Sequence, residues 1–166
     1  PAARAGRQEY LRAPGGPPGA LVARDEHRHR RGHRARHRPD AAEVVVGTDG
    51  QRAVVDDDPE MRAAMASLLS AYGYGAETFD SAETFLTCAS TSKATCLVVD
   101  IQLGDISGVE LAHQLAADGF TYPIIFMTGL DDEVIRTQAA AAGGVAFLHK
   151  PFPAQTLFDA IKKASG

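Results

Sequence analysis

The chain has 166 residues, enough for one domain of typical size with an appendage, and its formal net charge is −4. Its two cysteines, Cys88 and Cys96, do not form a CxxC pair, which excludes a disulfide framework and favours a reducing compartment. No apolar run approaches the roughly 18–20 residues that a membrane-spanning helix needs, so we expect a soluble, cytoplasmic protein without a membrane partner.

The charge is divided unevenly, and residues 1–50 are predicted to be a disordered leader rich in Arg, Gly, Pro and His. Residues 1–52 hold eleven arginines and six acidic residues, whereas residues 53–166 hold six basic and fifteen acidic residues. A segment with so few large apolar side chains cannot bury enough surface to offset its ordering entropy. Its run HRHRRGHRARHR, residues 27–38, suits a nucleic-acid arm, a metal-binding His tract or a leader without function. No aromatic residue interrupts that run for base stacking, so nucleic acid is not an expected partner.

The first strand and helix begin at residue 53. AVV at 53–55 predicts a strand that is short for the centre of a sheet, and the preceding Arg52 is too polar for such a strand, because a buried arginine is costly. Asp58 is a favoured helix cap, and Pro59 is a favoured first helical residue. The apolar residues that follow recur at helical spacing as far as Gly73. We therefore expect a helix that starts at Pro59.

The next units follow the same alternation. AETF at 76–79 predicts a second strand, and Asp80 with Glu83 resembles a capping box that opens the second helix. The remaining strands are predicted at TCLVV (95–99), PIIFMT (123–128) and VAFL (145–148), and the remaining helices are predicted to start at the capping box Ser107–Glu110, at the acidic run 131–133 and near Pro153.

Five strand–helix units in alternation indicate an α/β fold. Strands that are apolar on both faces are typical of a parallel sheet covered by helices on each side, so the predicted class is doubly wound. In such sheets ligands bind beyond the carboxyl ends of the strands, where the strand order reverses. The residues at those ends are therefore the candidate functional residues.

Chemically active side chains gather at these strand ends. Asp56 and Asp57 follow the first strand and Asp100 follows the third. Thr128 and Lys150 lie at the ends of the fourth and fifth. In a sheet with strand order 2-1-3-4-5 these ends are neighbours. Grouped carboxylates need a compensating cation, and Mg²⁺ takes oxygen ligands from one or two carboxylates together with phosphate oxygens. The pattern predicts a Mg²⁺ site beside a phosphoryl group, with Asp100 as the acceptor that forms an acyl phosphate.

Residues 53–165 resemble the receiver domain of bacterial two-component response regulators. The resemblance is carried by the segments VVDDDPEMR, VVDIQLGDISGVEL, FMTG and FLHKPF. It implies a flavodoxin-like doubly wound fold with a five-stranded parallel sheet of order 2-1-3-4-5. It also implies a role in phosphorelay signal transduction through Mg²⁺-dependent phosphorylation. We therefore divide the chain into a disordered leader, residues 1–50, and a receiver domain, residues 51–166.

The resemblance also implies roles for individual residues. These are metal ligation by Asp56, Asp57, Asp100 and the backbone carbonyl of Gln102; phosphoryl acceptance by Asp100, assisted by Lys150 and Thr128; and switching by Thr128 and Phe147. Asp58 is expected only to cap the first helix. The Lys150–Pro151 peptide bond is expected to be cis.

With these roles the protein is a phosphoacceptor and not an enzyme, apart from slow self-dephosphorylation. A histidine kinase, a phosphotransfer protein or a small acyl phosphate would supply the phosphoryl group. No output domain is recognisable before residue 53 or at the end of the chain. We therefore expect a stand-alone receiver that signals by contact with an unknown downstream protein; a fragment of a larger regulator is the alternative.

Two functions of other classes stay open. An aspartyl-phosphate phosphatase of the haloacid-dehalogenase type would also use Asp100 and Mg²⁺, but it would need a second aspartate where Gln102 stands. The other alternative is an Arg-rich nucleic-acid-binding arm attached to an inert receiver-like domain, which salt-dependent DNA binding would reveal.

Overall fold

The computed structural model describes residues 43–45 and 50–166. The elements in chain order are β1 (Glu43–Val45), β2 (Gln51–Val55), α1 (Pro59–Ala71), β3 (Gly75–Phe79), α2 (Ala82–Cys88), β4 (Ala94–Asp100), α3 (Gly108–Ala117), β5 (Ile124–Thr128), α4 (Glu133–Ala141), β6 (Gly144–His149) and α5 (Ala154–Ser165). Within these residues no helix is both long and apolar enough to cross a bilayer. The rest of the leader lies outside the described residues, so its disorder stays a prediction.

One six-stranded sheet runs in the order β1-β3-β2-β4-β5-β6. The last five of these strands are parallel neighbours, which confirms the predicted flavodoxin-like order 2-1-3-4-5. β1 was not predicted. Its residues, Glu43–Val45, pair antiparallel with β3, whereas the composition of the segment predicts a disordered leader there. The outer edge of β3 is thereby paired along three residues.

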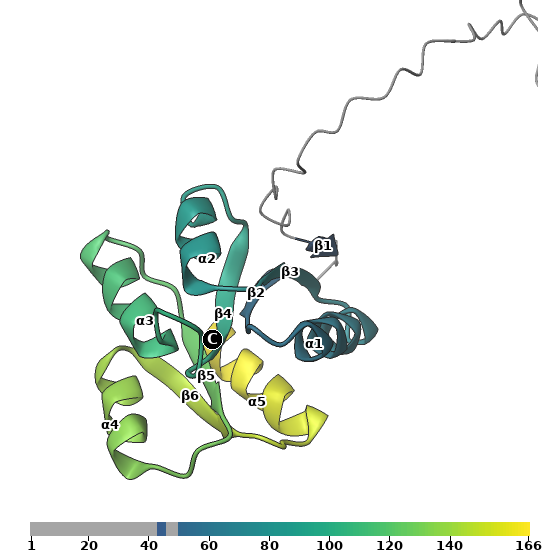
Figure 1. Cartoon of the computed structure of the whole chain (residues 1–166). Coiled ribbons are helices and arrows are strands. Elements are labelled where there is room, and N and C mark those ends of the chain that lie inside the picture. Colours follow the sequence, from purple (N-terminus) through teal and green to yellow (C-terminus); the bar gives the residue numbers. More distant parts are fainter. Residues whose placement is uncertain (1–42, 46–49) are drawn as a thin grey trace, which may run out of the picture. The chain divides into compact units, whose positions relative to one another are not determined.

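Helices cover both faces of the five parallel strands (Figure 1). α1 and α5 pack on one face, whereas α2, α3 and α4 pack on the other. Successive residues of β2 alternate between the two faces: Val54 packs with α1 and α5, and Ala53 and Val55 pack on the opposite side. All three are fully buried. This burial on two sides explains why the strand sequences are apolar without alternation.

Most helices start where the sequence predicts. The Asp58 carboxylate accepts hydrogen bonds from the backbone N–H groups of Glu60 and Met61, at 2.8 and 3.4 Å, and so caps α1. Ser107 and Glu110 form the predicted capping box of α3. α1 and α3 are therefore the helices that follow β2 and β4, the strands that carry the acidic residues at their carboxyl ends.

The start of α2 differs from the prediction. Ser81 is the cap, since its backbone is extended and its hydroxyl accepts a hydrogen bond from the Thr84 N–H at 3.2 Å. Asp80 instead accepts a hydrogen bond from the Thr84 hydroxyl at 2.9 Å. The predicted capping box of Asp80 with Glu83 is wrong, because the neighbouring serine takes the capping position.

β2 begins at Gln51, so the strand is longer than the predicted AVV, and the prediction that Arg52 is too polar for it is wrong. Arg52 is only 3% exposed, and its guanidinium donates to the Thr95 hydroxyl at 2.7 Å and to the Ser165 hydroxyl at 3.3 Å. It also lies over the ring of Tyr74, with 4.5 Å between Cζ and the ring centroid. These contacts offset part of the penalty of burying an arginine at the amino end of a central strand, and the buried Nε atom has no hydrogen-bond partner among the described residues.

Gly108, the first residue of α3, lies against the end of β4. A Cβ atom there would clash with the backbone oxygen of Asp100 and would lie 2.9 Å from Val99 Cγ1. Gly108→Ala should therefore lower the free energy of unfolding by about 1–3 kcal/mol, the usual range for overpacking. Gly104→Ala is the matched control, because a Cβ atom there meets nothing within 4 Å. Urea unfolding measures both variants, and equal stabilities would contradict the close contact.

Candidate functional site

The predicted site residues lie at the carboxyl edge of the sheet. Asp100 and Thr128 are the last residues of β4 and β5, Asp56 and Asp57 follow β2 directly, and Lys150 follows β6. β2, β4, β5 and β6 are parallel and adjacent, so their carboxyl ends meet at one edge. The topology thus brings residues as far as 94 positions apart in the sequence within hydrogen-bonding distance.

Three carboxylates form a compact group at this edge. Oxygen atoms of Asp56, Asp57 and Asp100 all lie within 4.8 Å of one another. Asp56 is completely buried and Asp100 is 6% exposed, whereas Asp57 is exposed to solvent. The group therefore has two buried carboxylates and one that is open to solvent.

Lys150 connects the two buried carboxylates. Its ammonium group donates to Asp100 Oδ2 at 2.7 Å and to Asp56 Oδ2 at 2.9 Å. The other oxygen of each carboxylate accepts a backbone hydrogen bond. Asp56 Oδ1 accepts from the Asp58 N–H at 2.9 Å, and Asp100 Oδ1 accepts from the Gln102 N–H at 3.0 Å. Each oxygen of the buried pair thus has a donor, which holds both side chains in one orientation.

Lys150 and Asp56 affect each other's pKa values. Burial raises the pKa of the Asp56 carboxyl above its usual value, although hydrogen bonds from Lys150 and from the Asp58 backbone oppose the shift. For Lys150 burial alone would lower the pKa, but the hydrogen bonds to Asp100 and Asp56 outweigh that effect and raise the pKa. Lys150 is therefore a cation at neutral pH, and its positive charge opposes the rise in the pKa of Asp56 that burial causes.

The donor set fits a hard divalent cation. The cluster holds three carboxylates, and its one ammonium group pairs with two of them, Asp56 and Asp100, which leaves negative charge uncompensated. Mg²⁺ prefers oxygen ligands and is commonly held by one or two carboxylates, with water and phosphate oxygens completing its shell. Asp56, Asp57 and Asp100 supply such oxygens. Gln102 is exposed beside them, and ligation by its backbone carbonyl stays a prediction.

The two predicted switch residues lie on the neighbouring strands β5 and β6. Thr128 is fully buried, and its hydroxyl accepts a hydrogen bond from the Leu130 N–H at 3.1 Å. Its backbone oxygen accepts from the Lys150 N–H at 2.7 Å, which ties the end of β5 to the site lysine. Phe147 is partly buried against the core beneath α2, α3 and α4. The peptide bond between Lys150 and Pro151 is cis, as predicted.

Two residues that support the site were given no role by the sequence, although both lie in segments that carry the family resemblance. The guanidinium of Arg62, in α1, donates to the Asp56 carbonyl at 2.7 Å and fixes the chain just beyond β2. Gly108 allows α3 to lie against the backbone of Asp100. Arg62 has the spacing of an ordinary half-exposed helix residue, so its position does not predict the hydrogen bond to Asp56. For Gly108 the available signal is a glycine placed directly after the Ser107 cap.

A family model described as the response regulator receiver domain matches residues 53–162. The response regulator protein TodT of Pseudomonas putida is 35% identical over 129 residues, which are 78% of this chain and 54% of TodT. The transcriptional regulatory protein FixJ of Rhizobium meliloti is 36% identical over 118 residues, which are 71% of this chain and 58% of FixJ.

Solved structures give the same match. The crystal structure of FixJ-N has a TM-score of 0.67 at 35% identity and covers 71% of this chain and 94% of that chain. The structure of the response regulator StyR has a TM-score of 0.64 at 40% identity and covers 69% of this chain and 58% of that chain. The chain spans about half the length of the curated relatives it matches, so its identity as a stand-alone receiver stays a prediction. In sequence and in fold, the chain belongs to the response regulator receiver family.

Proposed function

We propose that the chain accepts a phosphoryl group on Asp100 in a Mg²⁺-dependent reaction and passes the signal on by protein–protein contact. The observation that carries the proposal is the Lys150 ammonium group held between Asp100 and Asp56, beside the open carboxylate of Asp57. Receiver domains generally act as phosphoacceptors rather than as true enzymes, and they generally bind Mg²⁺ at an acidic pocket. The aspartate cluster and its lysine provide the matching groups in this chain.

The proposed transfer uses groups already positioned at the strand ends. One Asp100 oxygen attacks the phosphorus atom, so that a new oxygen–phosphorus bond forms while the bond from phosphorus to the donor's nitrogen or oxygen breaks. Lys150 stays protonated and offsets charge on the phosphoryl oxygens, and the Thr128 hydroxyl hydrogen-bonds one of them. Asp56, Asp57, Asp100 and the Gln102 carbonyl would hold Mg²⁺, and the ion would further neutralise phosphoryl charge, which is the main requirement of such a transfer.

The phosphoryl group would then change the surface next to the site. In this proposal the Thr128 hydroxyl leaves the Leu130 N–H and bonds the new phosphoryl oxygens, and the Phe147 side chain turns inward. α4, β6 and α5 would present an altered face to a downstream protein. Phosphorylation switches act in this way, by adding charge that biases an element with two arrangements.

The proposed donor is a histidine kinase or a phosphotransfer protein, and the proposed target is an unknown protein. Receiver domains of response regulators interact with histidine kinases and downstream effectors. A cytoplasmic location is part of the proposal, and the free thiols of Cys88 and Cys96 support it. The proposal also divides the chain into a leader, residues 1–50, and a receiver domain, residues 51–166. The family match, which starts at residue 53, supports this division.

The two alternative functions are not favoured. A phosphatase of the haloacid-dehalogenase type needs an aspartate where Gln102 stands, and the family that matches is a receiver family. The Arg- and His-rich run of the nucleic-acid alternative, residues 27–38, lies outside the described residues, and the family match does not include it.

Replacement of the acceptor tests the proposal. Incubated with Mg²⁺ and acetyl phosphate that carries labelled phosphorus, the native chain should become labelled, and Asp100→Asn should lower the label to background because an amide oxygen cannot form the acyl phosphate. Asp159→Asn removes an exposed carboxylate of α5 and is the matched control, which should keep full labelling. Full labelling of Asp100→Asn would overturn the assignment of the acceptor.

The neighbouring aspartates Asp57 and Asp58 should differ in their effect on Mg²⁺ binding. A ligand that binds only the folded chain raises its melting temperature, so thermal unfolding at increasing Mg²⁺ concentration reports the affinity. Asp57→Asn should weaken that affinity by about 10–100-fold, a range seen even for residues that only support metal ligands. Asp58→Asn should leave it unchanged, because Asp58 caps α1 and asparagine is an equally good cap. Equal affinities for the two variants would show that Asp57 is not a ligand.

A further inference from the structure

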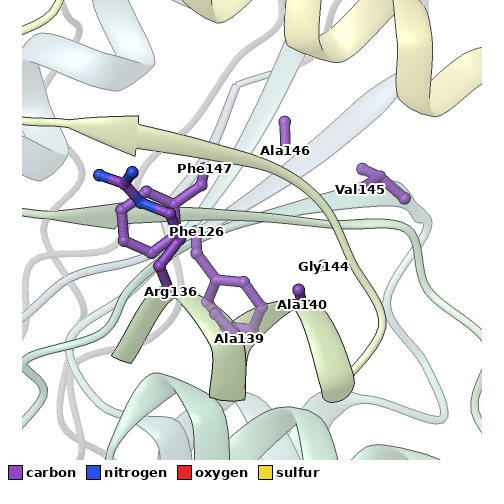
Figure 2. Close-up of a pocket in the computed structure, with 8 residues that line it drawn as sticks. All are labelled: Phe126, Arg136, Ala139, Ala140, Gly144, Val145, Ala146 and Phe147. Atoms are coloured by element: carbon purple, nitrogen blue, oxygen red, sulfur yellow. The ribbon is translucent and has the colours of Figure 1, made fainter. Parts of the chain in front are cut away.

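The guanidinium group of Arg136, in α4, lies over the aromatic ring of Phe147, in β6 (Figure 2). The distance from Arg136 Cζ to the ring centroid is 5.3 Å, within the range of cation–π attraction. The Arg136 side chain is 46% exposed, and Phe147 is partly buried. The contact therefore joins the helix to the strand at the protein surface, on the residue that the proposed function treats as the switch.

A cavity of about 120 Å³ lies beside this contact, between α4 and β6. Arg136 and Phe147 both line it, together with Ala139 of α4 and Gly144 of β6 (Figure 2). A ring next to a cavity makes fewer dispersion contacts than a ring in a close-packed core. Arg136 therefore supplies a larger share of the contacts that hold Phe147 where it is.

The cavity is local and does not reflect a general separation of α4 from the sheet. A Cβ atom added to Gly144 would lie 2.8 Å from the Ala139 backbone oxygen and 2.9 Å from the Phe126 ring. Helix and strand thus touch at that point. A change in the position of Phe147 can consequently occur next to the cavity without displacement of the whole helix.

Arg136 also forms ion pairs with carboxylates at the start of α4. Its guanidinium lies 3.4 Å from Asp131 Oδ1 and 3.5 Å from Glu133 Oε2, and these carboxylates are 84% and 81% exposed. Such exposed pairs add little stability, but they direct the guanidinium. Asp131 lies in the loop after β5, where the Thr128 hydroxyl accepts a hydrogen bond from the Leu130 N–H. A movement of that loop therefore moves a partner of Arg136.

We infer that Arg136 is a positioning residue that holds the Phe147 ring in its present place until the loop after Thr128 moves. The inference rests on the proposed function, in which the Thr128 hydroxyl leaves Leu130 for a phosphoryl oxygen. The loop then shifts Asp131, the guanidinium loses this partner, and its stack on the ring loosens. Arg136 thereby sets how readily the Phe147 switch responds to phosphorylation.

Fluorine resonances measure the ring position in the full-length chain. Incorporation of 4-fluorophenylalanine labels all seven phenylalanines, and Phe147→Leu identifies the resonance of interest. In the unphosphorylated chain, Arg136→Ala should raise the ratio of molecules with a displaced Phe147 ring to molecules with the ring in its present place. The expected increase is about two- to fivefold, the effect of losing an exposed cation–π contact. Gln138→Ala, exposed on the same helix and outside the cavity lining, is the matched control and should leave the ratio unchanged.

A second variant and a labelling assay separate this inference from the function on which it rests. Asp131→Asn combined with Glu133→Gln should shift the ratio in the same direction by a smaller factor, because loss of the ion pairs loosens the stack without removing the guanidinium. Labelling of Asp100 by acetyl phosphate should persist in Arg136→Ala. An unchanged fluorine ratio in Arg136→Ala, with Asp100 labelled normally, overturns the role of Arg136. Absence of label from the native chain overturns the proposed function instead.

Discussion

Between the ends of β2 and β4, the Lys150 ammonium group lies 2.7 Å from Asp100 Oδ2 and 2.9 Å from Asp56 Oδ2. Two carboxylates that have lost nearly all of their hydration repel one another, and burial raises the pKa of Asp56. A single lysine, itself only 19% exposed, pairs with both carboxylates and offsets their repulsion. Asp57 adds a third carboxylate at the open side of the cluster. The remaining negative charge is the physical reason why this edge of the sheet is suited to a divalent cation and, with it, to a phosphoryl group.

The fold keeps these charged groups together through backbone contacts rather than through the side chains alone. Parallel pairing places the carboxyl ends of β2, β4, β5 and β6 in one row. Arg62 holds the carbonyl group of Asp56, and the Thr128 backbone oxygen holds the N–H of Lys150. Gly108 permits α3 to approach Asp100 without a clash. The charges therefore stay close because these backbone contacts hold the chain segments that carry them.

Features that depend on a few adjacent residues could be predicted from the sequence. The apolar strands, the Asp58 cap and the acidic strand ends belong to this class, and the rules for parallel sheets together with the family resemblance then gave the strand order. The burial of Arg52 within β2 could not be predicted, because its partners, Thr95 and Ser165, lie 43 and 113 positions away along the chain. The pairing of Glu43–Val45 with β3 escaped for a similar reason, since the composition of that segment says nothing about a distant edge strand.

Urea unfolding of Lys150→Met at about pH 4.5 and pH 7.5, without divalent cations, tests the central claim most directly. Burial already raises the pKa of Asp56, and loss of Lys150 removes a hydrogen bond that opposes the shift, so this pKa should rise further. When the pKa of a carboxyl group is higher in the folded than in the unfolded state, the free energy of unfolding falls as the pH rises from the lower of these two pKa values to the higher. The variant should be less stable than the native chain by about 3 kcal/mol at the higher pH, as for a buried ion pair with one partner removed. The difference should be clearly smaller at the lower pH. An equal loss of stability at both pH values would contradict the account.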